Sequence, residues 1–489
     1  MNTSTRSPQA SAAAILSGGV ALFAHLALAA MLLVFSAPRL LAQETEAPSP
    51  EAKPEASEAA PADPFVKRRG GAAEGSEAEE ANKADPSEYV NAGLLVQHID
   101  VASERWEAWL AENAIPTAAS AEDLRREVEK WIAAGDAELG ETSLAMSRSG
   151  QRTKVESFLT VIYSEDFHFE AGPLPVPALK EAERQSVGSI VEFDSILEQD
   201  GSLAVSLSSQ RTGYLGEAPP RAETGVQEGD LRWPLFANQQ HIGSAVLGSD
   251  HWALLGSFAA LERPETHLTL LFARPAIHRF ATEDQSEGKP DPFPGDARPE
   301  ATLSFTWLEL PHDALNTLMM EAEDFSVWIG GGLREAANRA GGNVQREQSL
   351  RVQSGQRTKS ESVRELRYPT VFDAPREGHG PFSNPVGIKA SNIGTTVEVD
   401  PVIGRDGTVD LNFASEWLAH GGTSVLHRVL VEGEWLPNYT MPRIHTMKAT
   451  TQLSLPPGVP VLAAILSPPD EEGWPAPERK VLLFVEVSY

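Results

Sequence analysis

The sequence predicts an α+β fold made of two tandem copies of one unit, each with a small strand–helix–helix subdomain followed by a mainly antiparallel β region. Three observations lead to this prediction. A nine-residue segment occurs twice with eight identical positions, so the chain carries an internal duplication. Within each half, apolar residues recur first at helical spacing and then at alternating positions, which is typical of strands. The length of 489 residues exceeds one ordinary domain, and a hydrophobic fraction of 41% is enough for folded cores.

The duplication is clearest in Ser149–Ser157, which recurs as Ser354–Ser362. The shared motif consists of Ser149, Gly150, Gln151 and Arg152 in the first copy and Ser354, Gly355, Gln356 and Arg357 in the second. The register continues downstream, where Gly188–Asp194 matches Gly394–Asp400 and Asp200-Gly201 matches Asp406-Gly407. We therefore expect structural roles for these residues in a repeated unit of roughly 190 residues.

Each unit is expected to begin with one strand and two helices. In the first unit, residues 94–101 alternate as a strand and residues 103–112 form a helix. A second helix begins after Ser120 and ends at Gly135. The corresponding segments of the second unit are 303–310, 313–321 and 328–340.

The β region of each unit is expected to contain tight turns. The Ser-Gly-Gln segments predict hairpin turns, because glycine tolerates a positive φ between two extended runs. Asp200-Gly201 and Asp406-Gly407 are stronger hairpin signals, since alternating Val, Ile or Leu residues flank both of them.

The N-terminus has the pattern of an export signal. Residues 12–37 are almost entirely apolar, Arg6 precedes them, and a small-residue site ends at Ala42. We expect residues 1–42 to be a signal peptide, with an uncleaved membrane anchor as the alternative. The expected divisions that follow are a disordered acidic linker rich in Ala, Glu and Pro (43–86), the first repeat unit (87–280), a second linker (281–300) and the second repeat unit (301–489).

Charge and cysteine content exclude several classes of protein. The 69 acidic and 40 basic residues give a formal charge of −29, which argues against a nucleic-acid-binding protein. The chain has no cysteine, so disulfide scaffolds, thiol nucleophiles and cysteine-based zinc sites are excluded.

The search for catalytic motifs predicts that the chain is not an enzyme and needs no cofactor or metal. Neither a Gly-x-Ser-x-Gly elbow nor a His-Glu-x-x-His helix occurs. His420 and His427 fall in a glycine-containing stretch and are interpreted as loop histidines. The repeated carboxylates Glu192, Asp194, Glu398 and Asp400 are interpreted as solvent-facing strand charges rather than Ca²⁺ ligands.

Two tryptophans are candidate contacts for a partner. Trp417 and Trp435 lie in a loop-prone stretch, unlike the tryptophans at core spacing. Either residue could anchor a protein partner or stack on a sugar.

The second unit resembles the C-terminal domain of bacterial type II/III secretion secretins. The resemblance is carried by the hairpin-like Gly394–Phe413, by Pro442–Leu453 with Gly458–Leu462, and by the final apolar strand Val481–Val485. A degenerate copy covers 141–274. The chain departs from the family where Ala463-Ala464-Ile465 replaces the usual Gly-Gly-Leu, and the charged strand 357–368 does not suit lipid on either face.

The resemblance, taken together with these departures from the family, implies a noncatalytic, exported, secretin-like protein without an outer-membrane pore. Such a protein would be a structural or accessory component of an envelope secretion or pilus-type apparatus. It would lie in the periplasm or associate peripherally with the outer membrane, and would contact protein partners or itself through strand edges. The alternative is an extracytoplasmic protein that binds a glycan or peptide through Trp417 and Trp435. An exported hydrolase has only the loop around His420 in its favour.

Overall fold

The computed structural model describes residues 88–113, 120–163, 167–169, 177–179, 183–218, 233–281, 298–322, 325, 329, 332–373 and 380–489. All of them belong to one compact unit, Asp63–Tyr489. The expected signal peptide (1–42) and the first expected linker (43–86) lie outside the described residues, as does most of the second linker. None of the described helices combines the length and the apolar character that crossing a membrane requires.

The fold is predominantly β, so the α+β prediction is wrong. The described strands form two large antiparallel sheets, one of eight strands (sheet A) and one of ten (sheet B). In the order in which they pair, the strands of sheet A are β12 (Asn343–Gln353), β11 (Glu300–Pro311), β18 (Arg479–Ser488), β17 (Val461–Leu466), β2 (Ala137–Arg148), β1 (Glu88–Ala102), β10 (His267–Ala281) and β9 (Ala253–Ala259). Those of sheet B are β4 (Phe167–Phe169), β5 (Pro177–Leu179), β13 (Thr358–Asp373), β14 (Asn384–Ile403), β15 (Val409–Val431), β16 (Glu434–Leu455), β3 (Arg152–Tyr163), β6 (Glu183–Leu197), β7 (Leu203–Ala218) and β8 (Trp233–Leu247).

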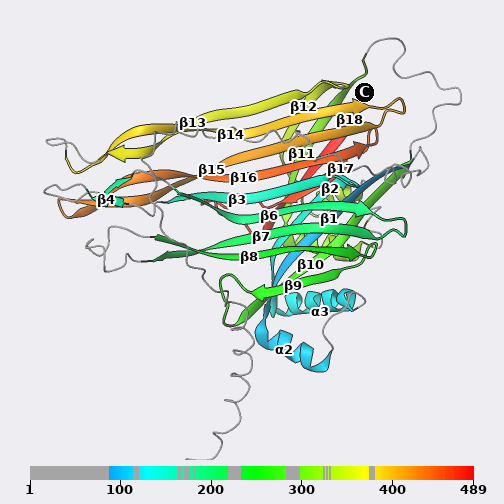
Figure 1. Cartoon of the computed structure of the whole chain (residues 1–489), viewed down its shortest axis with the longest axis horizontal. Helices are drawn as coiled ribbons and strands as arrows, with labels where there is room; N and C mark the ends of the chain where they lie inside the picture. The colour runs from blue at the N-terminus through cyan, green and yellow to red at the C-terminus, as the bar shows by residue number, and fades with distance from the viewer. Residues whose placement is uncertain are drawn as a thin grey trace, which may run out of the picture. The chain divides into compact units, whose positions relative to one another are not determined.

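The expected helices are present but form a small part of the chain. They are α2 (Ser103–Glu112), α3 (Ala121–Ala134), α4 (His312–Glu321) and α6 (Leu333–Arg339). Figure 1 shows α2 and α3 at one end of sheet A, where they follow β1. The long strands decide the fold class: β15 has 23 residues and β16 has 22. Their alternating pattern continues through polar segments that carry no obvious strand signal.

The best-formed helix, α3, shows why the local sequence adopts this structure. Leu124, Val128 and Trp131 recur on one face and are buried. Gly135 ends the helix with a φ of 82°, a left-handed conformation that glycine adopts without steric cost. The apolar face therefore attaches the helix to the end of the sheet while the opposite face stays in solvent.

The duplication is visible as a repeated strand order in both sheets. In sheet A the order β2-β1-β10-β9 of the first repeat matches β12-β11-β18-β17 of the second. In sheet B the order β3-β6-β7-β8 matches β13-β14-β15-β16. Even irregularities recur, because the β1–β2 register shifts after His98 and the β11–β12 register shifts after Trp307. Each sheet is therefore two four-stranded blocks laid side by side, with β4 and β5 added to sheet B.

One hydrophobic core lies between the two sheets and joins both repeats. It includes Leu94 and Phe305 from sheet A and Val155 and Phe413 from sheet B. The rings of Phe305 and Phe413 meet edge to face with centroids 5.4 Å apart. In Figure 1 the strands of sheet B run across the view and those of sheet A cross behind them at a steep angle.

A second, smaller core lies at the far ends of the long strands of sheet B. It contains Ile162, Tyr368, Phe372 and Tyr439, with the Phe372 and Tyr439 ring centroids 4.5 Å apart. Since β13 and β16 are separated by two strands in the sheet, this contact requires the sheet to curl.

Candidate functional site

The repeated Ser-Gly-Gln-Arg motif forms the corner at which the chain passes from sheet A to sheet B. Gly150 and Gly355 have φ values of 78° and 71°, so the expected positive φ is present. The expected hairpin is not, because β2 and β3 belong to different sheets, as do β12 and β13. The sequence indicated the turn geometry but not that the strands on either side would separate.

The corner is held by the same contacts in both copies. In the first, the Gly150 amide donates to the Ser195 carbonyl (2.6 Å), and Ser149 Oγ accepts from the Leu197 amide (3.0 Å). The Gln151 amide closes the turn on the Arg148 carbonyl at 3.1 Å. In the second copy the equivalent bonds are Gly355 to Pro401 (2.8 Å), Ile403 to Ser354 (3.0 Å) and Gln356 to Gln353 (3.0 Å).

The repeated carboxylates pair with the arginine of the motif. Arg152 contacts Glu192 at 3.2 Å and Asp194 at 2.9 Å, and it is 65% exposed. In the second copy, Arg357 lies 3.6 Å from Glu398 and 4.0 Å from Asp400. Exposed ion pairs of this kind contribute less than about 1 kcal/mol, so these pairs add little to the stability of the corner.

Gly394 and its counterpart Gly188 mark another repeated constraint. Their φ values are 138° and 137°, and a Cβ on either residue would collide with the carbonyl of the opposite strand, at Ser362 and Ser157 respectively. Only glycine suits this combination of backbone conformation and close approach.

The Asp-Gly segments lie in the hairpin turns that the sequence predicts. Asp200-Gly201 joins β6 to β7, and Asp406-Gly407 joins β14 to β15. The second turn also receives contacts from elsewhere in the chain. Tyr89 donates to Asp406 Oδ2 at 2.7 Å, and Tyr489 donates to the Gly407 carbonyl at 2.6 Å.

The structure places the two candidate tryptophans in different surroundings. Trp417 is half-buried on β15, packs against the main core, and has the Arg346 guanidinium 4.6 Å from its ring centroid. Trp435 is 44% exposed at the start of β16. The two residues therefore do not form one shared surface platform, and a ligand role for either stays a prediction.

The most strongly organised polar site is the junction between the two repeats. In sheet A, β2 of the first repeat pairs with β17 of the second, with Ala145 opposite Ala464. In sheet B, β3 pairs with β16 from Lys154 opposite Thr450 to Thr160 opposite Ile444. Both sheets therefore continue across the boundary without a break.

A buried ion pair lies inside this junction. Lys480 of β18 donates from Nζ to Glu141 Oε1 of β2 at 2.9 Å and to Ser467 Oγ at 2.5 Å. The Ser467 hydroxyl donates in turn to both oxygens of Glu141, at 2.8 and 2.9 Å. Lys480 and Ser467 are fully buried and Glu141 is 6% exposed. The charge on each partner is thus met by several polar contacts, as a buried ion pair requires.

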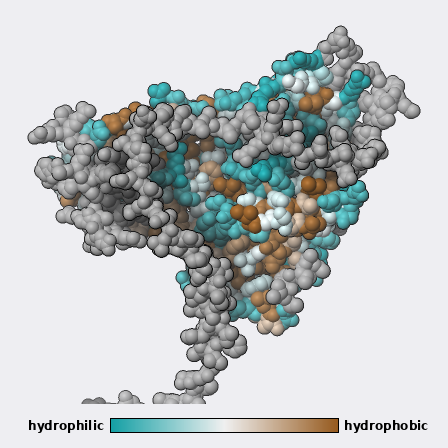
Figure 2. Space-filling model, viewed as in Figure 1, coloured by the Kyte–Doolittle hydropathy of each residue, from teal (hydrophilic) through white to brown (hydrophobic). Residues whose placement is uncertain are grey.

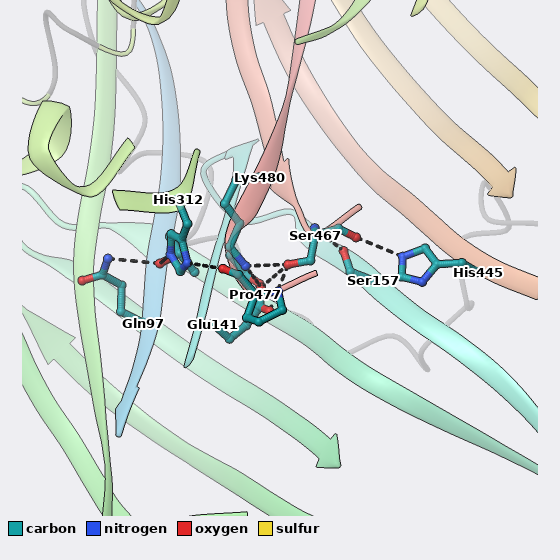
Figure 3. A network of polar contacts seen from close by, with 10 residues as sticks. Gln97, Glu141, Ser157, His312, His445, Ser467, Pro477 and Lys480 are labelled. Carbon is teal, nitrogen blue, oxygen red and sulfur yellow. Dashed lines mark hydrogen bonds and ion pairs between the residues drawn. The ribbon is translucent and has the colours of Figure 1, made fainter. Parts of the chain in front are cut away.

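The backbone of Ser467 extends the cluster into sheet B. Its amide donates to Ser157 Oγ at 3.0 Å, and its carbonyl accepts from His445 Nε2 at 3.0 Å. Figure 3 shows these groups in one line from Lys480 to His445. Ser157 belongs to the first repeat and His445 to the second, so this part of the cluster also crosses the junction.

On the side of the Lys480–Glu141 pair that faces away from His445, a second series of hydrogen bonds joins the helices of the two repeats. His312 donates from Nδ1 to the Pro477 carbonyl and accepts at Nε2 from the Thr142 hydroxyl, both at 2.7 Å. Thr142 also accepts from Gln97 Nε2 at 3.1 Å. Arg125 of α3 then donates from Nη2 to Asn316 Oδ1 of α4 at 2.7 Å.

Burial sets the protonation states of the junction. It lowers the pKa of His445 to about 4 and holds the pKa of His312 well below its ordinary value. Both imidazoles are therefore neutral at pH 7, consistent with the hydrogen bonds they make. Burial also lowers the pKa of Lys480, while the adjacent Glu141 carboxylate acts in the opposite direction.

The residues of the junction are suited to fixing a register rather than to reacting with a substrate. Lys480, Ser467 and His445 have no exposed surface. Sequence reasoning did not single out Lys480 or Glu141. The available signal was a lysine within the run Arg479–Phe484, where the neighbouring apolar residues leave little room for an unpaired charge.

In the described part of the chain, the edge of each repeat that lies away from the junction pairs with no strand of another four-stranded block. We name the β2–β3 or β12–β13 side of a repeat its front edge and the β9–β8 or β17–β16 side its back edge. The junction pairs the front edge of the first repeat with the back edge of the second. This leaves β12 and β9 as the outermost strands of sheet A, β8 as one outermost strand of sheet B, and β13 beside the short β5 and β4. On β13, every residue from Glu361 to Glu365 is exposed. Figure 2 shows hydrophilic residues along the upper margin, where Figure 1 places β12 and β13.

Two other candidates for a site, a cavity and a metal-binding cluster, have less support. A cavity of about 160 Å³ lies beside the small core, lined by Ile162, Arg184, Tyr368 and their neighbours. Within the described ranges, no group of three or more His, Asp or Glu side chains could hold a metal ion. The prediction of loop histidines is wrong, because His420 and His427 both lie on the long strand β15; His427 is buried against Tyr439, with ring centroids 5.1 Å apart.

Comparison with known proteins adds a weak structural neighbour. The chain matches no family model and no curated protein sequence. Among solved structures it is similar to a chain in the cryo-EM structure of the type II secretion system secretin GspD of E. coli K12, with a TM-score of 0.19 and 10% identity. The match covers 39% of this chain and half (50%) of that one. This likeness is too low to support an argument about fold or function.

Proposed function

We propose that this chain is a noncatalytic structural component of an envelope secretion or pilus-type apparatus. Its task in this role is to build a continuous two-layered β wall from repeated units. The export pattern of residues 1–42 supports a location outside the cytoplasm, in the periplasm or at the periphery of the outer membrane.

The observation that carries the proposal is the way the repeats add to one another. Two copies join strand to strand in both sheets at once, and a buried cluster of polar groups fixes their register. A binding module would need only one unit with a concave site. A unit that extends two sheets in parallel is suited to a wall or scaffold.

Deleting the gene in the source organism tests this role. We expect the deletion strain to lose one or more exported proteins from the medium, or to lose surface filaments, and the full-length chain to restore them. A chain lacking residues 1–42 is the matched control and should not restore them. Unchanged exported proteins and filaments in the deletion strain would contradict the proposed function.

A further inference from the structure

The two outer edges of the chain correspond, in the repeat, to the two edges that meet at the internal junction. The front edge of the second repeat (β12–β13) corresponds to the strands that the first repeat uses at the junction. The back edge of the first repeat (β9–β8) corresponds to the strands that the second repeat uses. Among the described residues, the outer side of β13 is paired only where Phe372 meets Leu179 of β5, beyond the stretch that corresponds to the junction.

We propose that a second copy of this chain docks its front edge on the back edge of the first, so that the internal junction is repeated between chains. The inference rests on the proposed structural role and names the partner that the open edges accept. Such an interface is heterologous, since it joins two different surfaces, and it can continue from copy to copy.

The internal junction predicts the register of the contact in sheet B. The hairpins align Leu247 of β8 with Leu455 of β16, since these residues lie opposite Leu203 and Val409 in the two repeats. The repeated motif aligns Lys359 with Lys154. Transferring the β3–β16 pairs places Lys359 opposite Ile242, Glu361 opposite Gln240, Val363 opposite Asn238 and Glu365 opposite Phe236 of the neighbouring copy.

The same transfer gives a consistent register in sheet A. At the junction, Leu144 pairs with Ile465 and Ala145 with Ala464. Their counterparts on the open edges are Ser349 with Ser257 and Leu350 with Gly256. The strand registers in sheet A and sheet B therefore agree on one position for the neighbouring chain, as they do at the internal junction.

Several apolar side chains on the outer edges are exposed, as expected of a surface that another chain covers. Ile242 and Val246 of β8 are 73% and 69% exposed, and Val363 of β13 is 36% exposed. Exposed apolar groups of this kind favour covering by another chain.

Cysteine cross-linking tests the register directly, because the natural chain contains no cysteine. In the full mature chain, Gln240→Cys combined with Glu361→Cys should give a ladder of covalent dimers and higher multimers on mild oxidation. The internal equivalent, Lys448→Cys with Glu156→Cys, should form a disulfide within one chain and no ladder. Mixing the two single variants Q240C and E361C should give a dimer only.

A register control and an edge control make the result decisive. Ser244→Cys with Glu361→Cys moves one thiol four residues along β8, and it should not give the ladder. Ile242→Lys places a lysine opposite Lys359 and should weaken self-association by at least about tenfold in sedimentation or mass photometry. Ile196→Lys changes another exposed isoleucine (54% exposed) on β6, away from the edge, and should leave association unchanged.

The inference is overturned if Q240C/E361C stays monomeric while the internal pair cross-links, or if the register control cross-links equally well. Its failure is distinguishable from failure of the proposed function. Monomeric protein whose deletion still stops export would refute this interface alone. A cross-linked ladder in a chain whose deletion changes no exported protein or filament would refute the proposed role alone.

Discussion

Lys480 donates a 2.9 Å hydrogen bond to Glu141 from the other repeat, and both residues are buried. The two residues lie 339 positions apart in the chain. The corresponding positions of the other repeat hold different residues. This contact belongs to the internal junction, where the two repeats meet.

Removing one member of this pair should destabilise the chain strongly. We expect Lys480→Ala or Glu141→Ala to lower the free energy of unfolding by about 3–5 kcal/mol, because the remaining charge is left buried without its partner. The double variant Lys480→Met/Glu141→Leu should recover a large part of the loss. Urea unfolding followed by fluorescence measures each difference. Arg351→Ala, which breaks the exposed pair with Glu300, is the control and should cost less than about 1 kcal/mol. Equal losses of stability for the buried and the exposed pair would show that the buried Lys480–Glu141 pair has no special role in stability.

Stability should fall as the pH is lowered from about 6.5 to about 4. His445 has a pKa near 4 in the folded chain, below the ordinary value of 6.5, so in this window the unfolded chain binds more protons. Each such histidine contributes up to about 1.4 kcal/mol per pH unit, and His427 acts in the same direction. His445→Gln should reduce the slope of stability against pH by about one proton, measured by urea unfolding at stepped pH. An unchanged slope would exclude His445 as a contributor.

The glycines opposite the corner strands should not tolerate a side chain. Gly394→Ala and Gly188→Ala are each expected to lower the free energy of unfolding by at least about 2 kcal/mol, since both the φ value and the opposing carbonyl resist a Cβ. Gly248→Ala is the matched control, because a Cβ there would meet only a His251 ring carbon at 3.6 Å. Thermal melts of the three variants compare them, and similar melting temperatures for all would disprove the constraint.

Substitution of the two tryptophans should change the stability of the chain by different amounts. Trp417→Ala removes a half-buried ring that packs on the core and lies against Arg346, so we expect a loss of about 2 kcal/mol or more. Trp435→Ala, at 44% exposure, should change stability by less than about 1 kcal/mol. Binding of a glycan or peptide library to wild type but not to W435A would favour the alternative function of the sequence analysis. Equal stability losses would contradict the different environments.

Local signals in the sequence predicted individual elements well. The helix at residues 103–112 and the stop at Gly135 are confirmed, because an apolar face and a left-handed glycine are local properties. The Asp-Gly turns are confirmed for the same reason. The fold class was wrong because β14, β15 and β16 owe much of their length to cross-strand pairing, which no short window reports.

The junction could not be predicted, for a related reason. Glu141, Ser467 and Lys480 come from three strands, and each looks like an ordinary polar residue in its own segment. Only the sheet order brings them together. The motif of Ser149 to Arg152 was visible because duplication preserved it, but its role at a corner between two sheets required the three-dimensional structure.

The Lys480–Glu141 contact occurs once per chain, and the positions that correspond to it on the open edges hold Leu268 and Arg346. Copies joined end to end would therefore alternate between two kinds of seam, one locked by a buried charge pair and one without it. A polymer of this kind has a period of two repeats, and under load or dilution it comes apart at every second seam. Because the two repeats belong to one polypeptide, whole chains are the parts that exchange, and any closed assembly contains an even number of repeats.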